Sequence, residues 1–133
     1  MKTNFAINDL VVMDLSPRWP ILTVLTEDDP ILRRFGQVDV VDLDTGHPQS
    51  ILRKKADEVW AVLEGEAHFS LKDQREDSPT FEHSETVTLS GEIFRAVMVP
   101  FGVACRVETP AHALCLRLTT HADSTTPEDQ VPG

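Results

Sequence analysis

The chain has 133 residues, of which 41% are hydrophobic, and its 22 acidic and 12 basic residues give a formal net charge of −10. This length fits one domain of ordinary size, and no run approaches the roughly 18–20 apolar residues of a membrane-spanning helix. Nucleic-acid-binding proteins usually carry a basic excess, so the acidic charge argues against nucleic acid and anionic membranes as partners. The acidic net charge is still compatible with a small anionic ligand that a few converging Arg and Lys side chains bind.

The two ends of the chain differ in composition from its middle. Residues 1–17 are expected to form an N-terminal arm, in which Asn8–Leu15 shows a weak helical pattern. The arm has no basic region followed by an apolar stretch, so it predicts no secretory signal, and we expect a cytoplasmic protein. Residues 122–133 are polar and contain two prolines, which predicts a flexible acidic tail. Residues 18–121 then form the folded domain.

The middle of the chain consists of short apolar runs broken by Pro, Gly, Asp and Ser. These runs are Ile21–Leu25, Val38–Leu43, Val59–Leu63, Ala67–Leu71, Thr86–Leu89, Ala96–Val99, Cys105–Val107 and Leu114–Leu118. Several alternate with period two, as half-buried strands do. Many short strands separated by turns predict an all-β sandwich or barrel.

Two positions have a Gly or Pro between apolar runs, as hairpin turns do. Leu63–Glu66 places a glycine between two apolar runs, which predicts a tight turn with a positive φ at Gly65. Folding about Pro110 would bring Cys105 near Cys115, since the two are equidistant from it. Two cysteines are too few for a disulfide scaffold or a four-cysteine zinc site, and in the cytosol we expect them to stay reduced.

Two segments resemble the paired motifs of the cupins. Lys54–Gly65 (KKADEVWAVLEG) resembles the first motif, with Glu58 and the glycine at the motif spacing. Leu89–Val107 (LSGEIFRAVMVPFGVACRV) resembles the second, with Pro100 and Gly102 in place. The two motifs occur in the cupin order and at about the cupin separation.

The resemblance is to the RmlC-like cupin superfamily, and within it to the dTDP-sugar 3,4-ketoisomerase and dTDP-4-dehydrorhamnose 3,5-epimerase branch. The Lys-Lys pair before Glu58, which contains Lys55, resembles a pair at that place in the ketoisomerase motif. Arg95 resembles an Arg in the corresponding segment of the epimerases. The resemblance implies an all-β cupin double-stranded β-helix, that is, a single-domain jelly-roll barrel. It also implies a homodimer and an isomerase or epimerase that moves a proton beside a carbonyl. Cupins host many chemistries, so the fold is the stronger of these expectations.

The residues that hold a metal in other cupins are replaced. Ile51 and Arg53 stand at the His-x-His positions, Cys105 stands at the later His position, and Glu58 remains. A catalytic zinc or iron site needs about three convergent protein ligands. Arg53 would place a fixed positive charge where the cation should lie. We therefore expect no metal and no other cofactor.

The same substitutions remove the family's acid–base groups. Proton transfer beside a ketone needs a group with a pKa near the working pH, and neither Ile51 nor Arg53 provides one. The chain also contains no Tyr to act as a proton donor. The remaining catalytic candidates are Arg53 and Glu58 facing the barrel interior, His47 as a relocated base, and Cys105 as a thiol.

The ligand-binding candidates are Trp60, Lys55, Arg95 and Arg117. Trp60 shares a strand face with Glu58 and could stack on a ring, although core packing is the commoner role of a Trp at such a position. In the last strand, alternation puts Arg117 and Cys115 on one face and Leu114, Leu116 and Leu118 on the other. If Arg117 faces inward, the three leucines need a cover, most naturally a second copy of the chain.

The sequence leaves three hypotheses open. The first is a metal-independent cupin that isomerises a carbonyl-bearing or sugar-nucleotide-like ligand. The second is a cupin dimer that binds a small molecule, or regulates a partner, without turnover. The third is a structural dimer whose barrel is filled by side chains. The missing His pair and the absence of Tyr favour the second hypothesis over a standard isomerase.

Overall fold

The computed structural model describes residues 7–15, 17–18, 22–25, 35–52 and 56–121. These residues form eight strands, all paired antiparallel, and no helix. The strands are β1 (Val11–Asp14), β2 (Gln37–Asp44), β3 (Gln49–Ile51), β4 (Glu58–Asp73), β5 (Ser84–Ser90), β6 (Arg95–Val99), β7 (Val103–Glu108) and β8 (His112–Thr119). The described residues contain no helix long and apolar enough to cross a membrane.

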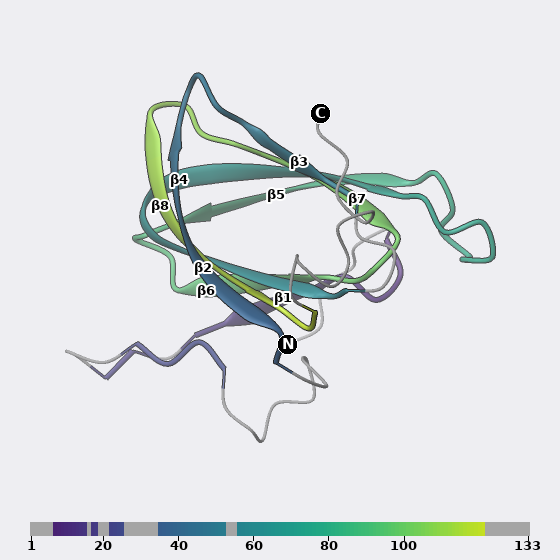
Figure 1. Ribbon diagram of the computed structural model, residues 1–133, viewed down its shortest axis with the longest axis horizontal. Helices are drawn as coiled ribbons and strands as arrows, with labels where there is room; N and C mark the ends of the chain where they lie inside the picture. Colours follow the sequence, from purple (N-terminus) through teal and green to yellow (C-terminus); the bar gives the residue numbers. More distant parts are fainter. Residues whose placement is uncertain (1–6, 16, 19–21, 26–34, 53–55, 122–133) are drawn as a thin grey trace.

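The sixteen-residue strand β4 belongs to both halves of the barrel. Its first half pairs with β6 and β8, and β1 and β2 extend that group at its two edges. Its second half pairs with β5 and β7, and β3 extends that group beside β7. Figure 1 shows the two groups curving around a shared interior. The all-β jelly-roll prediction is confirmed.

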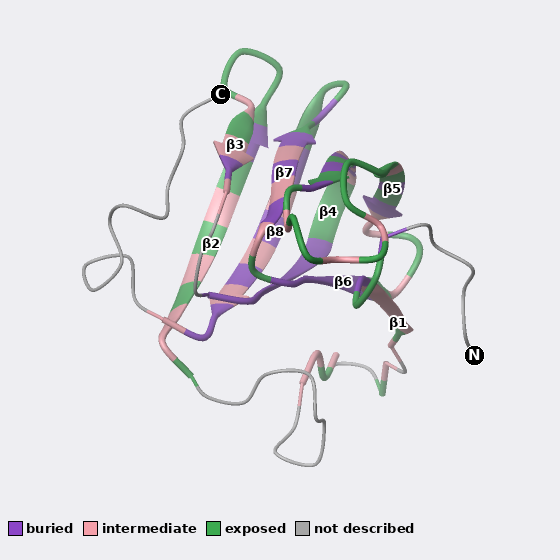
Figure 2. Ribbon diagram, turned by 90° about the vertical axis from the view of Figure 1, so that its right-hand side faces the viewer, coloured by how far each residue is buried: buried purple, intermediate pink, exposed green. Residues whose placement is uncertain are grey.

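The core fills the space between the two strand groups. Trp60 and Val97 face it from the first group, and Phe69, Leu89 and Val107 face it from the second. Buried residues alternate with more exposed ones along β7 and β8, as Figure 2 shows. This period-two pattern is the one by which the sequence predicted these strands.

The expected hairpin at Leu63–Glu66 is wrong, although Gly65 does have a positive φ of 81°. The chain does not reverse there. Strand β4 continues through Gly65, next to a shift in its register with β8 between Val62 and Glu64. A Cβ at Gly65 would lie 2.0 Å from the carbonyl oxygen of His112. The glycine is therefore needed for a close approach of two strands where β4 passes from one group to the other.

The expected position of Cys105 beside Cys115, across a hairpin at Pro110, is also wrong. The turn at Pro110 links β7 to β8, but these strands lie in different groups and do not pair. Cys105 lies opposite Ile51 and Leu71, whereas Cys115 lies opposite Val41 and Val62. Both cysteines are free and buried.

The N-terminal region departs from the sequence-based expectation as well. Asn8–Leu15 is not helical, because Val11–Asp14 forms β1 and pairs with β6. Within the predicted run Ile21–Leu25, Ile21 lies outside the described residues and residues 22–25 form no strand. Val24 and Leu25 instead pack against Val59, Ala61 and their neighbours on the outer face of the first group.

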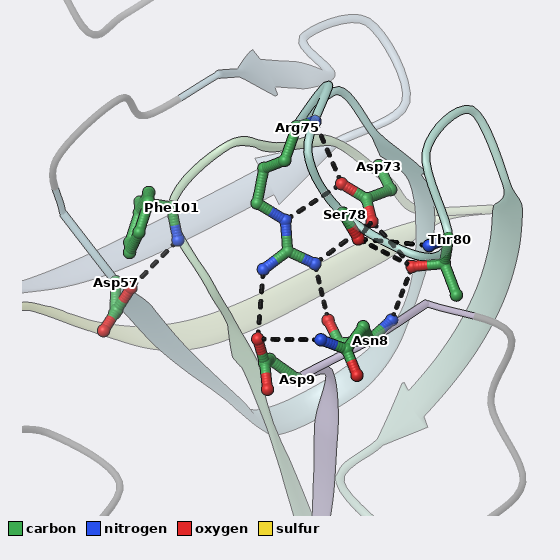
Figure 3. Close-up of polar contacts among 8 residues, drawn as sticks. All are labelled: Asn8, Asp9, Asp57, Asp73, Arg75, Ser78, Thr80 and Phe101. Atoms are coloured by element: carbon green, nitrogen blue, oxygen red, sulfur yellow. Dashed lines mark hydrogen bonds and ion pairs between the residues drawn. The ribbon is translucent and has the colours of Figure 1, made fainter.

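A buried polar cluster fixes the loop between β4 and β5. The carboxylate of Asp73 is fully buried and accepts hydrogen bonds from the Arg75 guanidinium and from the hydroxyls of Ser78 and Thr80. Arg75 also reaches the Asp9 carboxylate at 3.2 Å, as Figure 3 shows. The loop between β4 and β5 thus anchors the N-terminal segment.

Candidate functional site

The cupin motif positions converge inside the barrel as the resemblance implies. Ile51 and Cys105 are direct partners across β3 and β7, and both are buried. Glu58, the first residue of β4, is 2% exposed, and its carboxylate acts electrostatically on the Cys105 thiol. Three of the four motif positions therefore meet in the interior. The fourth, Arg53, lies outside the described residues, as does Lys55.

Glu58 is held by two side chains from the first strand group. Its Oε1 accepts a hydrogen bond of 3.0 Å from Nε1 of Trp60. Its Oε2 lies 3.7 Å from Nη1 of Arg117. Among the described residues, the cation beside Glu58 is Arg117 from β8, a contact that the sequence did not predict.

The guanidinium of Arg117 lies between two carboxylates. Its Nε and Nη2 donate hydrogen bonds of 3.0 and 2.6 Å to Oδ2 of Asp39 on β2. Arg117 and Asp39 are direct partners across the two strands, which explains the contact. The Asp39 side chain is 30% exposed and that of Arg117 is 9% exposed. Solvent therefore reaches this group of side chains from the Asp39 end.

Asp39, Glu58, Trp60 and Arg117 form what we call the interior cluster. Trp60 is 1% exposed and packs edge to face against Phe69, with ring centroids 5.6 Å apart. The Arg117 guanidinium carbon lies 6.0 Å from the Trp60 ring centroid, within the range of a cation–π contact. The cluster thus combines a fixed cation, a buried carboxylate and an aromatic ring.

Alternation along β8 was left open by the sequence, and the structure decides it. Ala113, Cys115 and Arg117 are buried and face inward. Leu114, Leu116 and Leu118 are half-buried and face outward. Because Arg117 faces inward, the three leucines lie on the outer face of β8 and need a cover.

The donors at the motif positions do not fit a metal centre. Burial, with a further contribution from the Glu58 carboxylate, raises the pKa of Cys105, so the thiol stays protonated near neutral pH. Glu58 lies next to the permanent positive charge of Arg117. Ile51 offers no donor atom. The described residues contain no gathering of three or more His, Cys, Asp or Glu side chains that could hold a metal ion.

Among the described residues, Cys105 has no neighbour of the kind that makes a thiol reactive. A nucleophilic cysteine needs a nearby base or positive charge to lower its pKa. The electrostatic influence on Cys105 comes instead from a carboxylate, and the residue is 5% exposed. Its environment is that of a small core side chain.

His47 and Arg95 lie outside the interior cluster. The His47 side chain is 81% exposed, and its Nδ1 lies 2.8 Å from Oδ1 of Asp44. This contact lowers the pKa of Asp44 and closes the loop between β2 and β3. Arg95 is 47% exposed and pairs with Asp14 at 2.9 Å across β6 and β1. Both side chains serve local surface contacts.

Asp39 is the residue of the cluster that sequence reasoning missed. The register of β2 with β8 could have identified it, because a buried Arg on β8 needs an acidic partner on the adjacent strand. Alternation along residues 37–44 also separates Asp39 from Val38 and Val40. Without the pairing of β2 and β8, nothing linked Asp39 to Arg117.

Comparison with known proteins shows a likeness in structure without one in sequence. No family model matches the chain, and no curated protein matches it either. The structure resembles a dTDP-sugar isomerase from Desulfovibrio desulfuricans G20, with a TM-score of 0.85 and 20% identity over 96% of this chain and 85% of that one.

Two epimerase structures are similar as well. A dTDP-4-dehydrorhamnose 3,5-epimerase from Bacillus anthracis str. Ames, solved with TDP and PPi bound, gives a TM-score of 0.80 at 19% identity, over 99% of this chain and 81% of that one. The structure of the dTDP-4-dehydrorhamnose 3,5-epimerase from Sulfolobus tokodaii gives a TM-score of 0.77 at 18% sequence identity. The match covers 92% of this chain and 76% of that one. At these identities the likeness establishes the fold. The chain therefore has the single-domain jelly-roll fold of the RmlC-like cupins, which it shares with these sugar-nucleotide isomerases and epimerases.

Proposed function

We propose that the protein is a metal-independent cupin that binds a sugar-nucleotide-like ligand at the barrel interior without turning it over. The observation that carries this proposal is the interior cluster, in which the Arg117 guanidinium is fixed between two carboxylates beside the Trp60 ring. A fixed guanidinium suits the phosphate groups of such a ligand. The similarity in fold to proteins that act on dTDP-sugars supports this ligand class.

The surroundings of the cluster favour binding over catalysis. Arg117 cannot accept a proton near neutral pH, and the Cys105 thiol is protonated. None of the five histidines is buried. Within the interior cluster, the isomerase hypothesis would therefore need a carboxylate, Glu58 or Asp39, as its base, and both contact the Arg117 guanidinium. Free, buried thiols at Cys105 and Cys115 support a cytoplasmic location.

A direct test uses Asp39, which covers the solvent side of the guanidinium. A ligand phosphate would have to compete with its carboxylate for Arg117. We expect Asp39→Asn to strengthen dTDP binding by about tenfold, because removal of one competing charge is worth on the order of 1.4 kcal/mol. Isothermal titration calorimetry with dTDP and dTDP-glucose measures the change.

Asp42→Asn is the matched control. It makes the same charge change on the same strand, but Asp42 faces outward and its carboxylate is 71% exposed. Equal gains in affinity from both variants would indicate a general charge effect and contradict the proposal, as would a lack of dTDP binding by the wild type. Deuterium uptake from heavy water into a bound dTDP-4-keto sugar would overturn the absence of turnover.

We also propose that a second copy of the chain covers the outer face of the first strand group. Val38 and Val40 on that face are 49% and 67% exposed, next to the outward leucines of β8. On the same face, Val59 and Ala61 are already covered by Val24 and Leu25. The covered and uncovered areas are continuous, because Val59 and Ala61 lie opposite Leu118 and Leu116. Exposed apolar area of this kind marks an interface.

We expect Val40→Lys to convert the dimer to a monomer, since a charge at the centre of an apolar interface would lose its hydration. Sedimentation velocity of the wild type and the variant measures the masses. Ile93→Lys is the control, because Ile93 is 49% exposed but lies in the turn before β6. A monomeric wild type, or a Val40→Lys variant that remains dimeric, would refute this arrangement.

A further inference from the structure

A cavity of about 400 Å³ lies across the outer face of the second strand group, on the opposite side of that group from the core. The side chains of Ser50, Arg106, Ser70 and Thr86 lie in one row across β3, β7, β4 and β5. Ala104, Lys72 and Ser84 form the next row. All seven residues line the cavity, which we call the outer groove.

The outer groove is hollow because small side chains occupy most of these positions. Ala104 lies directly opposite Lys72 and two positions along β7 from Arg106. The two cations are therefore diagonal neighbours on antiparallel strands, a relation that places their Cα atoms about 7–8 Å apart. Within the two rows, the side chains between and beside them are a methyl group and hydroxyls, and Leu52, Gln74 and Glu85 also line the cavity.

The charge of the outer groove is opposite to that of the protein. Its two rows contain Lys72 and Arg106 and no carboxylate. Among the other described residues that line the cavity, only Glu85 is charged, so the lining is net positive in a chain with a net charge of −10. Arg106 contacts Ser50 Oγ at 3.3 Å and Glu108 at 3.4 Å, with 42% of its side chain exposed. The Lys72 side chain is exposed, and among the described residues no ion pair or side-chain hydrogen bond engages its ammonium group.

We propose that the outer groove is a second binding site, for a small phosphate-bearing molecule. Two cations at this spacing can contact one phosphate or diphosphate group from both sides, while the Ser and Thr hydroxyls donate hydrogen bonds to its oxygens. The volume lies within the range of small-molecule sites. The site is separate from the interior cluster, since its side chains point away from the core.

The test uses inorganic pyrophosphate as the probe, at low ionic strength because exposed charges are screened by salt. We expect Lys72→Gln and Arg106→Gln each to weaken pyrophosphate binding by about tenfold, the loss typical of one charge-assisted contact. We expect pyrophosphate to shift the backbone amide NMR signals of Ser70 and Thr86. Arg95→Gln, which removes a half-exposed Arg elsewhere, should leave binding unchanged.

The controls separate this site from the interior cluster. Asp39→Asn should not alter the pyrophosphate affinity of the outer groove, whatever it does to dTDP binding. Equal affinity in the wild type, Lys72→Gln and Arg106→Gln, or amide shifts confined to the neighbourhood of Asp39, would overturn the proposal. Binding of ribose as tight as that of ribose 5-phosphate would also overturn it, because the phosphate would then contribute nothing.

Discussion

Asp73→Asn is expected to destabilise the protein by about 3–5 kcal/mol, the cost of removing one partner from a buried ion pair. The Asp73 side chain is 0% exposed and that of Arg75 is 13% exposed. The substitution keeps the shape of the side chain but replaces an acceptor oxygen with an NH₂ group, which would face the donors of Arg75, Ser78 and Thr80. Urea denaturation followed by tryptophan fluorescence measures the change.

Asp9→Asn is the matched control for this variant. Asp9 contacts the same guanidinium at 3.2 Å, but its carboxylate is 63% exposed. Exposed ion pairs contribute at most about 1 kcal/mol, and Asn tolerates the positive φ of 68° at this position. A loss of stability in Asp9→Asn as large as that in Asp73→Asn would show that burial of Asp73 is not the cause.

The same cluster should make stability depend on pH. Burial alone would raise the pKa of Asp73, but hydrogen bonds from Arg75, Ser78 and Thr80 outweigh burial and hold this pKa well below its usual range. A carboxyl whose pKa is lowered on folding stabilises the protein above its unfolded pKa of about 4 and loses this contribution as the pH falls further. The stability difference between wild type and Asp73→Asn should therefore narrow below about pH 4.

Arg117→Met is expected to cost about 3 kcal/mol for a related reason. It removes the guanidinium that lies 3.7 Å from the Glu58 carboxylate, which is 2% exposed, and the hydrogen bonds to Asp39. Met fills similar space, so most of the loss should come from the carboxylates that remain. Thermal and urea denaturation measure the change in the free energy of unfolding.

The double variant Glu58→Gln/Arg117→Met distinguishes charge from packing. Neutralising Glu58 removes the buried charge, so the double variant should be more stable than Arg117→Met alone. Two residues in direct contact should also show a non-additive effect in a double-mutant cycle. If the two single effects simply add, the interior cluster is not electrostatically coupled, and the proposed ligand site loses its basis.

The fold could be predicted because its signals are local. Short apolar runs, several of them with period-two alternation, located six of the strands. The spacing of Glu58, Gly65, Pro100 and Gly102 indicated the cupin motifs. The error at Gly65 arose because a positive φ is compatible with either a turn or a close approach between strands. Sequence shows that glycine is favoured there but not which of the two geometries requires it.

The candidate site could be predicted only in part because its contacts are long-range. Glu58, Trp60 and Arg117 were singled out separately, yet their association depends on the register of β4 with β8. Asp39 joins them through the pairing of β2 with β8, which no local pattern indicates. Alternation by itself would assign Val38 and Val40 to the core, whereas the pairing of Asp39 with Arg117 turns both valines outward.

The central position of β4 has a consequence for the way in which the chain folds. The early strands β1, β2 and β3 do not pair with one another, and their partners β6, β8 and β7 all come later in the chain. Each of those partners pairs in turn with β4. During synthesis, the described strands β1, β2 and β3 therefore have no partner strand until β6, β7 and β8 have emerged from the ribosome. Such long-range pairings close slowly, so we expect the barrel to fold only once β8 is available and to take milliseconds to seconds.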